Sequence, residues 1–113
     1  MNSRGELAED AASAFLVRQG LTPVTRNYRC RFGEIDLIFG DGATLVFVEV
    51  RFRKNKEFGG ASESITYAKQ RKLLRAARHY MSEQHRFPAC RFDAVLLNGD
   101  TSDIEWLRNA FGE

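Results

Sequence analysis

The sequence predicts a mixed α/β fold in which one β-sheet is flanked by helices. Residues 34–38 and 45–51 have the composition of two strands, and the turn signal Gly40-Asp41-Gly42 joins them as a hairpin. A helical pattern precedes this hairpin, and a second helical pattern and a buried strand follow it. The resulting order is a helix, a three-stranded antiparallel meander, a helix and a strand, which is typical of a mixed sheet covered by helices.

The first helix is indicated by its start, its apolar stripe and its end. Ser3 followed by Glu6 is the signature of a capping box, and Gly20 stops the pattern. The stripe consists of Leu7, Ala11, Ala14, Phe15 and Leu16. Residues 22–31 come next, and because they are highly charged and carry Pro23 near their start, we expect an edge strand that pairs with the hairpin.

The second helix follows a basic loop that contains Gly59 and Gly60. Ser64 or Thr66 can cap this helix, and its basic side chains are expected to point outward. The side chains expected to face inward are Ile65, Tyr67, Leu73, Leu74, Ala77, Tyr80 and Met81. Beyond the helix, residues 92–97 read as a buried strand, and residues 104–107 are a candidate for a short last strand.

Two acids lie within the predicted hairpin. Because side chains alternate along a strand, Glu49 shares a face with Arg51, and a four-residue loop, 41–44, places Asp36 opposite Glu49. A two-residue loop, 41–42, shifts the pairing by two residues and keeps both acids on one face. The other face is apolar and contains Ile35, Leu37, Val46, Val48 and Val50. We therefore expect the carboxylates to cluster in a sheet that is covered on both sides.

Clustered carboxylates need a counter-charge. Like charges that face each other across strands cost about 0.2–1 kcal/mol, and partial burial increases this cost. A divalent metal neutralises them with hard oxygen ligands, and Arg51 supplies a fixed positive charge beside Glu49. The residues leave a second interpretation open, in which Glu34 and Arg51 form a structural cross-strand pair and the acids lie at a solvated sheet edge.

Length and composition point to a single domain, residues 1–113, with a hydrophobic core of its own. Apolar residues make up 43% and charged residues 28%, which is typical of a globular protein. The sequence has no signal-peptide pattern and no apolar run of membrane-spanning length, so we expect no membrane association and a cytoplasmic location.

Charge is segregated along the chain. From Arg51 to Arg86, ten basic and three acidic residues give a net charge of +7, whereas the remaining residues sum to −5. Such a segment suits a phosphate backbone, so nucleic acid is the expected partner, although a solvated helix face is an open alternative. The candidate contacts are Arg53, Lys54, Lys56, Lys69, Lys72 and Arg75.

Asp36, followed after a turn and a strand by Glu49-Val50-Arg51, is similar to the PD-(D/E)XK nuclease signature. The chain also resembles, over nearly its whole length, the bacterial YraN-like family, which is regarded as related to Holliday junction resolvases and restriction endonucleases. The residues that carry this resemblance are Glu9, Ala12, Leu16, Gly20, Asn27-Tyr28-Arg29, Gly33-Glu34-Ile35-Asp36-Leu37-Ile38, Val46-Phe47-Val48-Glu49-Val50-Arg51, Arg53, Phe58-Gly59, Lys69 and Asn109-Ala110-Phe111.

The resemblance implies a restriction-endonuclease-like fold with a metal-dependent site. It implies that Asp36 and Glu49 hold Mg²⁺ or Mn²⁺ and that Glu9 completes the acidic cluster. Phosphodiester hydrolysis needs such a cation, because it offsets charge on the phosphate and makes a bound water nucleophilic. Gln70 is placed where related nucleases often carry a residue that supports the site.

One position departs from the nuclease pattern, which has a lysine where this chain has Arg51. Arginine can neutralise and orient a phosphate, but it stays protonated and is a poor proton acceptor. Lys54, on the following loop, substitutes for this lysine only if that loop folds back. Arg51 is nevertheless the residue expected to act beside the acids.

Three functions follow as expectations. The first is a metal-dependent endonuclease-like domain that hydrolyses DNA, with branched DNA as the substrate by analogy. The second is a DNA-binding module that keeps the fold and the acids but has lost turnover, which Arg51 favours. The third is a protein-interaction domain whose basic helix docks an acidic partner. Junction resolvases act as dimers, so a homodimer is open too, but no residue pattern identifies its interface.

Overall fold

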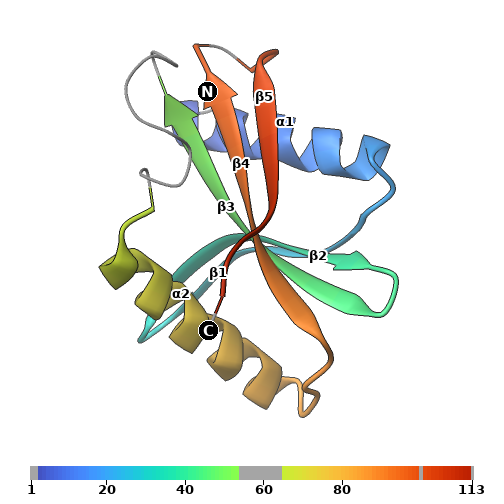
Figure 1. Ribbon diagram of the computed structural model, residues 1–113, viewed down its shortest axis with the longest axis vertical. Helices are drawn as coiled ribbons and strands as arrows, with labels where there is room; N and C mark the ends of the chain where they lie inside the picture. Colours follow the sequence, from blue (N-terminus) through green and yellow to red (C-terminus); the bar gives the residue numbers. More distant parts are fainter. Residues whose placement is uncertain (1–2, 54–64, 100, 113) are drawn as a thin grey trace.

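The computed structural model describes residues 3–53, 65–99 and 101–112, and these form one five-stranded sheet and two helices (Figure 1). The elements are α1 Arg4–Arg18, β1 Thr22–Cys30, β2 Gly33–Asp41, β3 Thr44–Arg53, α2 Tyr67–Glu83, β4 Cys90–Asn98 and β5 Ile104–Phe111. The predicted α/β class and element order are therefore confirmed, and the last strand is longer than the predicted residues 104–107.

The strands lie in the order β1-β2-β3-β4-β5, so that the chain builds the sheet from one edge to the other. β1, β2 and β3 form the predicted antiparallel meander, and β4 and β5 are also antiparallel. β3 and β4 are parallel, because the chain crosses over through α2 between them. β1 lies at the sheet edge and is largely exposed, as its charged sequence predicts.

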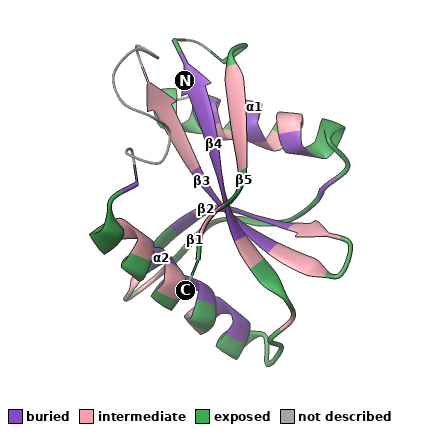
Figure 2. Ribbon diagram, in the orientation of Figure 1, coloured by how far each residue is buried: buried purple, intermediate pink, exposed green. Residues whose placement is uncertain are grey.

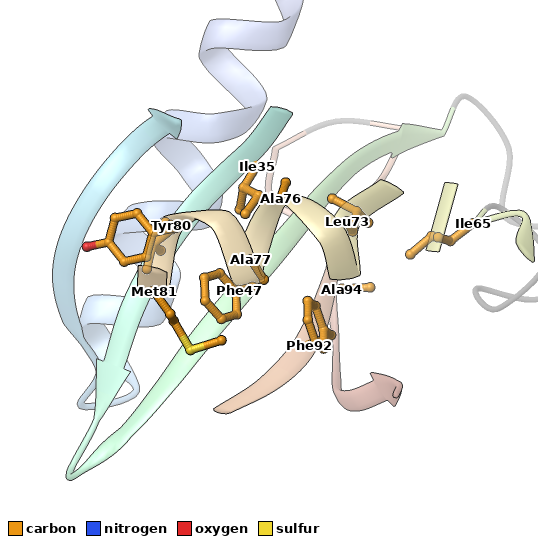
Figure 3. Close-up of a cluster of buried hydrophobic side chains, with 11 residues drawn as sticks. Ile35, Phe47, Ile65, Leu73, Ala76, Ala77, Tyr80, Met81, Phe92 and Ala94 are labelled. Atoms are coloured by element: carbon orange, nitrogen blue, oxygen red, sulfur yellow. The ribbon is translucent and has the colours of Figure 1, made fainter. Parts of the chain in front are cut away.

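Figure 1 shows the twisted sheet with α1 on one face and α2 on the other. Each helix covers a separate hydrophobic cluster. The cluster under α2 joins helix residues such as Leu73 and Ala77 to Phe47 on β3 and Phe92 on β4 (Figure 3). Burial of one such side chain stabilises the fold by about 1.5–3 kcal/mol. In Figure 2, β4 is buried along most of its length, because both helix layers cover it.

The predicted capping box begins α1, because Ser3 Oγ accepts a hydrogen bond from the Glu6 amide at 3.1 Å and the Glu6 side chain bonds back. The predicted apolar stripe is rotated, however. The buried residues of α1 are Ala8, Ala12 and Leu16, with spacing i, i+4, i+8. Small alanines let this helix lie close to the sheet, whereas the larger Leu7 is exposed.

Thr66 caps α2, and its hydroxyl accepts a hydrogen bond from the Lys69 amide at 3.2 Å. The expected inward residues Leu73, Ala77 and Tyr80 are buried. Tyr67 was expected among them, but it is 72% exposed. Six helical steps separate Tyr67 from Leu73, and at 3.6 residues per turn they place Tyr67 about 120° away around the helix.

β2 changes face at Asp36. Ile35 was expected beside Leu37, yet Ile35 packs under α2 while Leu37 packs under α1. The neighbouring strand explains this change, because Asn27 on β1 has a φ of 54°, in the left-handed region. The residues that flank Asn27 on β1 are Arg26, which pairs with Leu37, and Tyr28, which pairs with Ile35. These two side chains also lie on opposite faces of the sheet.

No helix within residues 3–53, 65–99 and 101–112 is long and apolar enough to cross a membrane.

Candidate functional site

Asp36 and Glu49 line one groove of about 330 Å³ beside the N-terminal half of α2. β2 supplies the first carboxylate and β3 the second, and Lys69 and Lys72 line the same groove from α2. The hairpin pairs Gly40 with Leu45 and continues in this register to Leu37 with Val48. This is the register that directs Asp36 toward Glu49, so the expected clustering of the two carboxylates is observed.

Glu49 is a buried carboxylate with two cations beside it. It lies in the middle of the sheet, next to Ala94 of β4, and is 4% exposed. Lys69 Nζ lies 2.9 Å from Glu49 Oε1, and Arg51 Nε lies 3.3 Å from the same oxygen. Burial of a charged carboxylate destabilises the fold unless the carboxylate is paired. These two ion pairs therefore explain why Glu49 can be buried in the core.

Arg51 contributes charge to this site without a well-aligned hydrogen bond. Its buried Nε has no hydrogen-bond partner among the described residues, although Glu49 lies close to it. The alternative in which Glu34 pairs with Arg51 is not the arrangement found. Glu34 instead pairs with Arg29 of the neighbouring strand, with 3.4 Å between Glu34 Oε1 and Arg29 Nε.

Asp36 lies where β2 changes face. Its Oδ2 accepts a hydrogen bond from the Val50 amide at 2.8 Å, just beyond the last pair of the β2–β3 ladder. Burial and, next to it, the negative charge of Glu49 raise the pKa of Asp36 to about 7, although the hydrogen bond from Val50 lowers it. Asp36 is therefore the less well-neutralised member of the acid pair.

Glu9 lies close enough to Asp36 for its charge to raise the pKa of Asp36 as well. Its carboxylate, however, pairs with Arg26 of β1, with 3.5 Å between Glu9 Oε1 and Arg26 Nε. Arg26 also binds Asp10 at 2.7 Å and so clamps α1 to the sheet edge. The structure thus brings Glu9 near the acid pair, but the carboxylate of Glu9 forms an ion pair with Arg26.

The donor set fits a divalent cation that needs few protein ligands. In the part of the chain that is described, no group of three or more histidine, cysteine, aspartate or glutamate side chains is arranged to hold a metal ion. Mg²⁺ needs no such cage, because it commonly binds one or two carboxylates and completes its shell with waters and substrate phosphates. Asp36 and Glu49 match that requirement, and the Asp36 oxygen that does not bind Val50 has no partner among the described residues.

Lys69 is the candidate site residue whose position sequence reasoning missed. It was expected to contact phosphates from the outer surface, but the structure directs it to Glu49, and it is 40% exposed. A signal was available: Lys69 lies four residues before the buried Leu73, on the flank of the helix that borders the sheet. Lysine keeps a flexible amine that can lose its proton, which arginine cannot.

The other residues expected to contact nucleic acid lie in different parts of the structure. Lys72 lines the groove of the acids, whereas Arg75 lines a second groove on the opposite flank of α2. Gln70 donates to the Ile65 carbonyl at 3.0 Å and fixes the entry to the helix. Arg53 donates to Asn98 Oδ1 at 2.9 Å and pairs with Glu105, so it ties β3 to the next strands. Lys54 and Lys56 lie outside the described residues.

The fold and the groove together define a mixed α/β protein with a buried and a partly buried carboxylate next to a basic helix. Comparison with known families identifies it further, because residues 8–97 match the model of the uncharacterised protein family UPF0102. The chain belongs to this family, which confirms the predicted family membership.

Relatives of similar length support this assignment. A UPF0102 protein of Nitrosospira multiformis is 62% identical over 109 residues, which cover 96% of this chain and 92% of that protein. One from Nitrosomonas eutropha is 58% identical over 111 residues, with 98% and 95% covered. One from Psychromonas ingrahamii is 50% identical over 112 residues, with 99% and 92% covered.

Proposed function

We propose that this protein is a metal-dependent endonuclease that hydrolyses phosphodiester bonds of DNA, branched DNA included, in the cytoplasm. The observation that carries the proposal is the groove in which the acid pair Asp36 and Glu49 faces Lys69 and Lys72. Acids that hold a cation and amines that bind phosphate are the two requirements of metal-assisted phosphodiester hydrolysis. The resemblance of the two strand motifs to the PD-(D/E)XK signature supports the same reaction.

Asp36 and Glu49 are the residues that hold Mg²⁺ or Mn²⁺ in this proposal. When bound, the cation offsets charge on the phosphate oxygens and lowers the pKa of a water. Asp36 binds in its ionised form, which the pKa of about 7 makes available at neutral and higher pH. Glu9, engaged by Arg26, acts on the site through its charge and is not required as a ligand.

Lys69 takes the part that the nuclease pattern gives to a lysine on the strand. Its amine already lies against Glu49, where it can orient a water or transfer a proton at the scissile phosphate. Arg51 stays charged beside the same carboxylate and stabilises negative charge on the phosphate. Lys72 lies along the groove and contacts the backbone of the substrate.

Cleavage assays on duplex, single-stranded, flapped and four-way DNA in Mg²⁺ or Mn²⁺ test this proposal. We expect Asp36→Asn and Glu49→Gln to abolish cleavage while the proteins still fold. Glu34→Gln is the matched control, because Glu34 lines the same groove but pairs with Arg29. Equal activity of all three variants and the wild type would remove the acid pair from catalysis.

A DNA-binding module without turnover is the second candidate, and the arginine at position 51 favours it. In that case the wild type binds DNA in EDTA but cleaves none of the four substrates with either metal. A positive cleavage assay on any of them that disappears in Asp36→Asn contradicts this second candidate.

A further inference from the structure

A second groove, of about 390 Å³, runs along the flank of α2 that faces away from the acid pair. Its described lining consists of Tyr67, Gln70, Arg71, Leu74, Arg75, Arg78 and Gly112. Gly112, which follows β5, is part of this lining, and Figure 1 shows this end of β5 beside α2. The helix thus separates this groove from the candidate catalytic groove.

Positive charge dominates this groove. Arg71, Arg75 and Arg78 follow one another at intervals of about one helical turn, so their guanidinium groups lie on one side of α2. The described residues that line the groove include no acid. A run of three guanidinium groups on one side of a helix is complementary to a chain of phosphates.

An exposed aromatic ring stands at one end of the same groove. Tyr67 is 72% exposed, although a ring of this size normally lies in a core or an interface. Arg71 holds it from the next turn, because Arg71 Nη1 donates to Tyr67 Oη at 3.2 Å and its guanidinium lies 5.9 Å from the ring centroid. The ring is therefore fixed by a neighbour while its surface stays open to solvent.

We propose that this groove binds a single-stranded segment of nucleic acid, with a base stacked on Tyr67 and the phosphates along Arg75 and Arg78. The inference rests on the proposed function and names the form of the substrate. Stacking on a side chain requires a base whose face is not already covered by its neighbours, as in single strands, flaps and frayed junctions. An acidic peptide would use the arginines but would leave the ring without a role.

Fluorescence anisotropy in EDTA tests the proposal without the metal site, with a labelled single strand and a duplex of the same length as probes. Tyr67→Ala is expected to weaken single-strand binding at least fivefold, because one base–aromatic stack is lost, and to leave duplex binding unchanged. Tyr67→Phe is expected to keep the wild-type affinity. Phe87→Ala is the matched control, since Phe87 is 70% exposed but lies outside the groove.

The arginines are tested by the dependence of affinity on salt. Arg75→Ala is expected to reduce the slope of log affinity against log salt by about 0.7 on the single strand. Arg18→Ala, an exposed arginine in the last turn of α1, is expected to leave the slope unchanged. Tyr67 is 72% exposed and belongs to neither hydrophobic cluster of the described residues, so thermal melts of the Tyr67 variants should match the wild type and exclude misfolding as the cause.

Two results would overturn the proposal. One is an equal effect of Tyr67→Ala on single-stranded and duplex DNA, or no effect on either. The other is displacement of the single strand by polyglutamate at equal charge concentration, which would reduce the groove to a general anion surface. The two grooves are tested separately, because Asp36→Asn should lose cleavage and keep single-strand binding. If the protein cleaves no DNA, single-strand binding at Tyr67 can still be measured, and if Tyr67 has no effect on binding, cleavage can still be measured.

Discussion

Lys69 of α2 and Glu49 of β3 form an ion pair in which Nζ lies 2.9 Å from Oε1. The carboxylate is buried within the sheet, and the amine reaches it from the helix that covers this face. The pair places a lysine next to the second acid of the motif, although the strand itself carries Arg51 there. A lysine that is distant in sequence thereby becomes a neighbour of the acid pair in space.

The role of Lys69 predicts an asymmetry between two exchanges of lysine and arginine. Lys69→Arg keeps the charge but removes the amine that can transfer a proton, so cleavage should fall by about 100-fold to 10,000-fold. Arg51→Lys should retain or raise cleavage, because lysine supplies the same charge. Turnover rates at saturating DNA measure both effects. If Lys69→Arg is as active as the wild type, Lys69 acts only as a charge.

The two acids should respond differently to neutralisation in the metal-free protein. Asp36→Asn removes a repelled carboxylate and keeps an oxygen for the Val50 amide, so we expect a stabilisation of up to about 1 kcal/mol. Glu49→Gln breaks the pairs with Lys69 and Arg51 and should cost about 1–3 kcal/mol. Urea unfolding of both variants measures this. A destabilised Asp36→Asn protein would argue that the ionised carboxylate of Asp36 is stabilised in the folded protein and is not repelled by Glu49.

The pKa of Asp36 predicts how stability depends on pH. Its pKa is about 7 in the folded protein, whereas the ordinary pKa of an aspartate is 3.8. Between these values the folded state binds more protons than the unfolded state, so this group lowers the free energy of unfolding as pH rises from about 4 to about 7. The free energy of unfolding of the wild type, measured at pH 5 and at pH 8, should include this decrease. Asp36→Asn should lack this part of the pH dependence, and an identical dependence in both proteins would contradict the assignment.

The strand and cap signals of the sequence were local, and they predicted the local features correctly. Alternation placed Asp36 and Glu49 together, and Ser3 with Glu6 predicted the first cap. The change of face at Ile35 was not predictable in this way, because it depends on the left-handed conformation of Asn27 on another strand.

Buried polar contacts between distant segments were equally hidden from the sequence. Asp93, which precedes the apolar run of residues 94–97 in β4, is fully buried. It accepts hydrogen bonds from Arg91 Nε at 3.0 Å, Trp106 Nε1 at 3.0 Å and the Asn109 amide at 2.9 Å. Two of these donors come from the neighbouring strand β5, so only the folded sheet shows why an aspartate is tolerated here.

Lys72 should contribute to DNA binding through charge alone. It lines the groove of the acids without an ion pair to them, so Lys72→Ala should reduce the slope of log affinity against log salt on duplex DNA by about 0.9. Anisotropy titrations at a series of salt concentrations measure the slope, and Arg18→Ala serves as the control on α1. An unchanged slope would mean that Lys72 belongs to a solvated helix face.

Calorimetric titration of Mn²⁺ at pH 8, with and without a short DNA duplex, tests the proposed metal site most directly. We expect the wild type and Glu34→Gln to bind the cation, and we expect Asp36→Asn and Glu49→Gln not to bind it. Binding at pH 6 should be weaker, because protons compete for Asp36. Mn²⁺ binding of equal strength in all four proteins, or none in the wild type under either condition, would contradict the claim that Asp36 and Glu49 hold the metal.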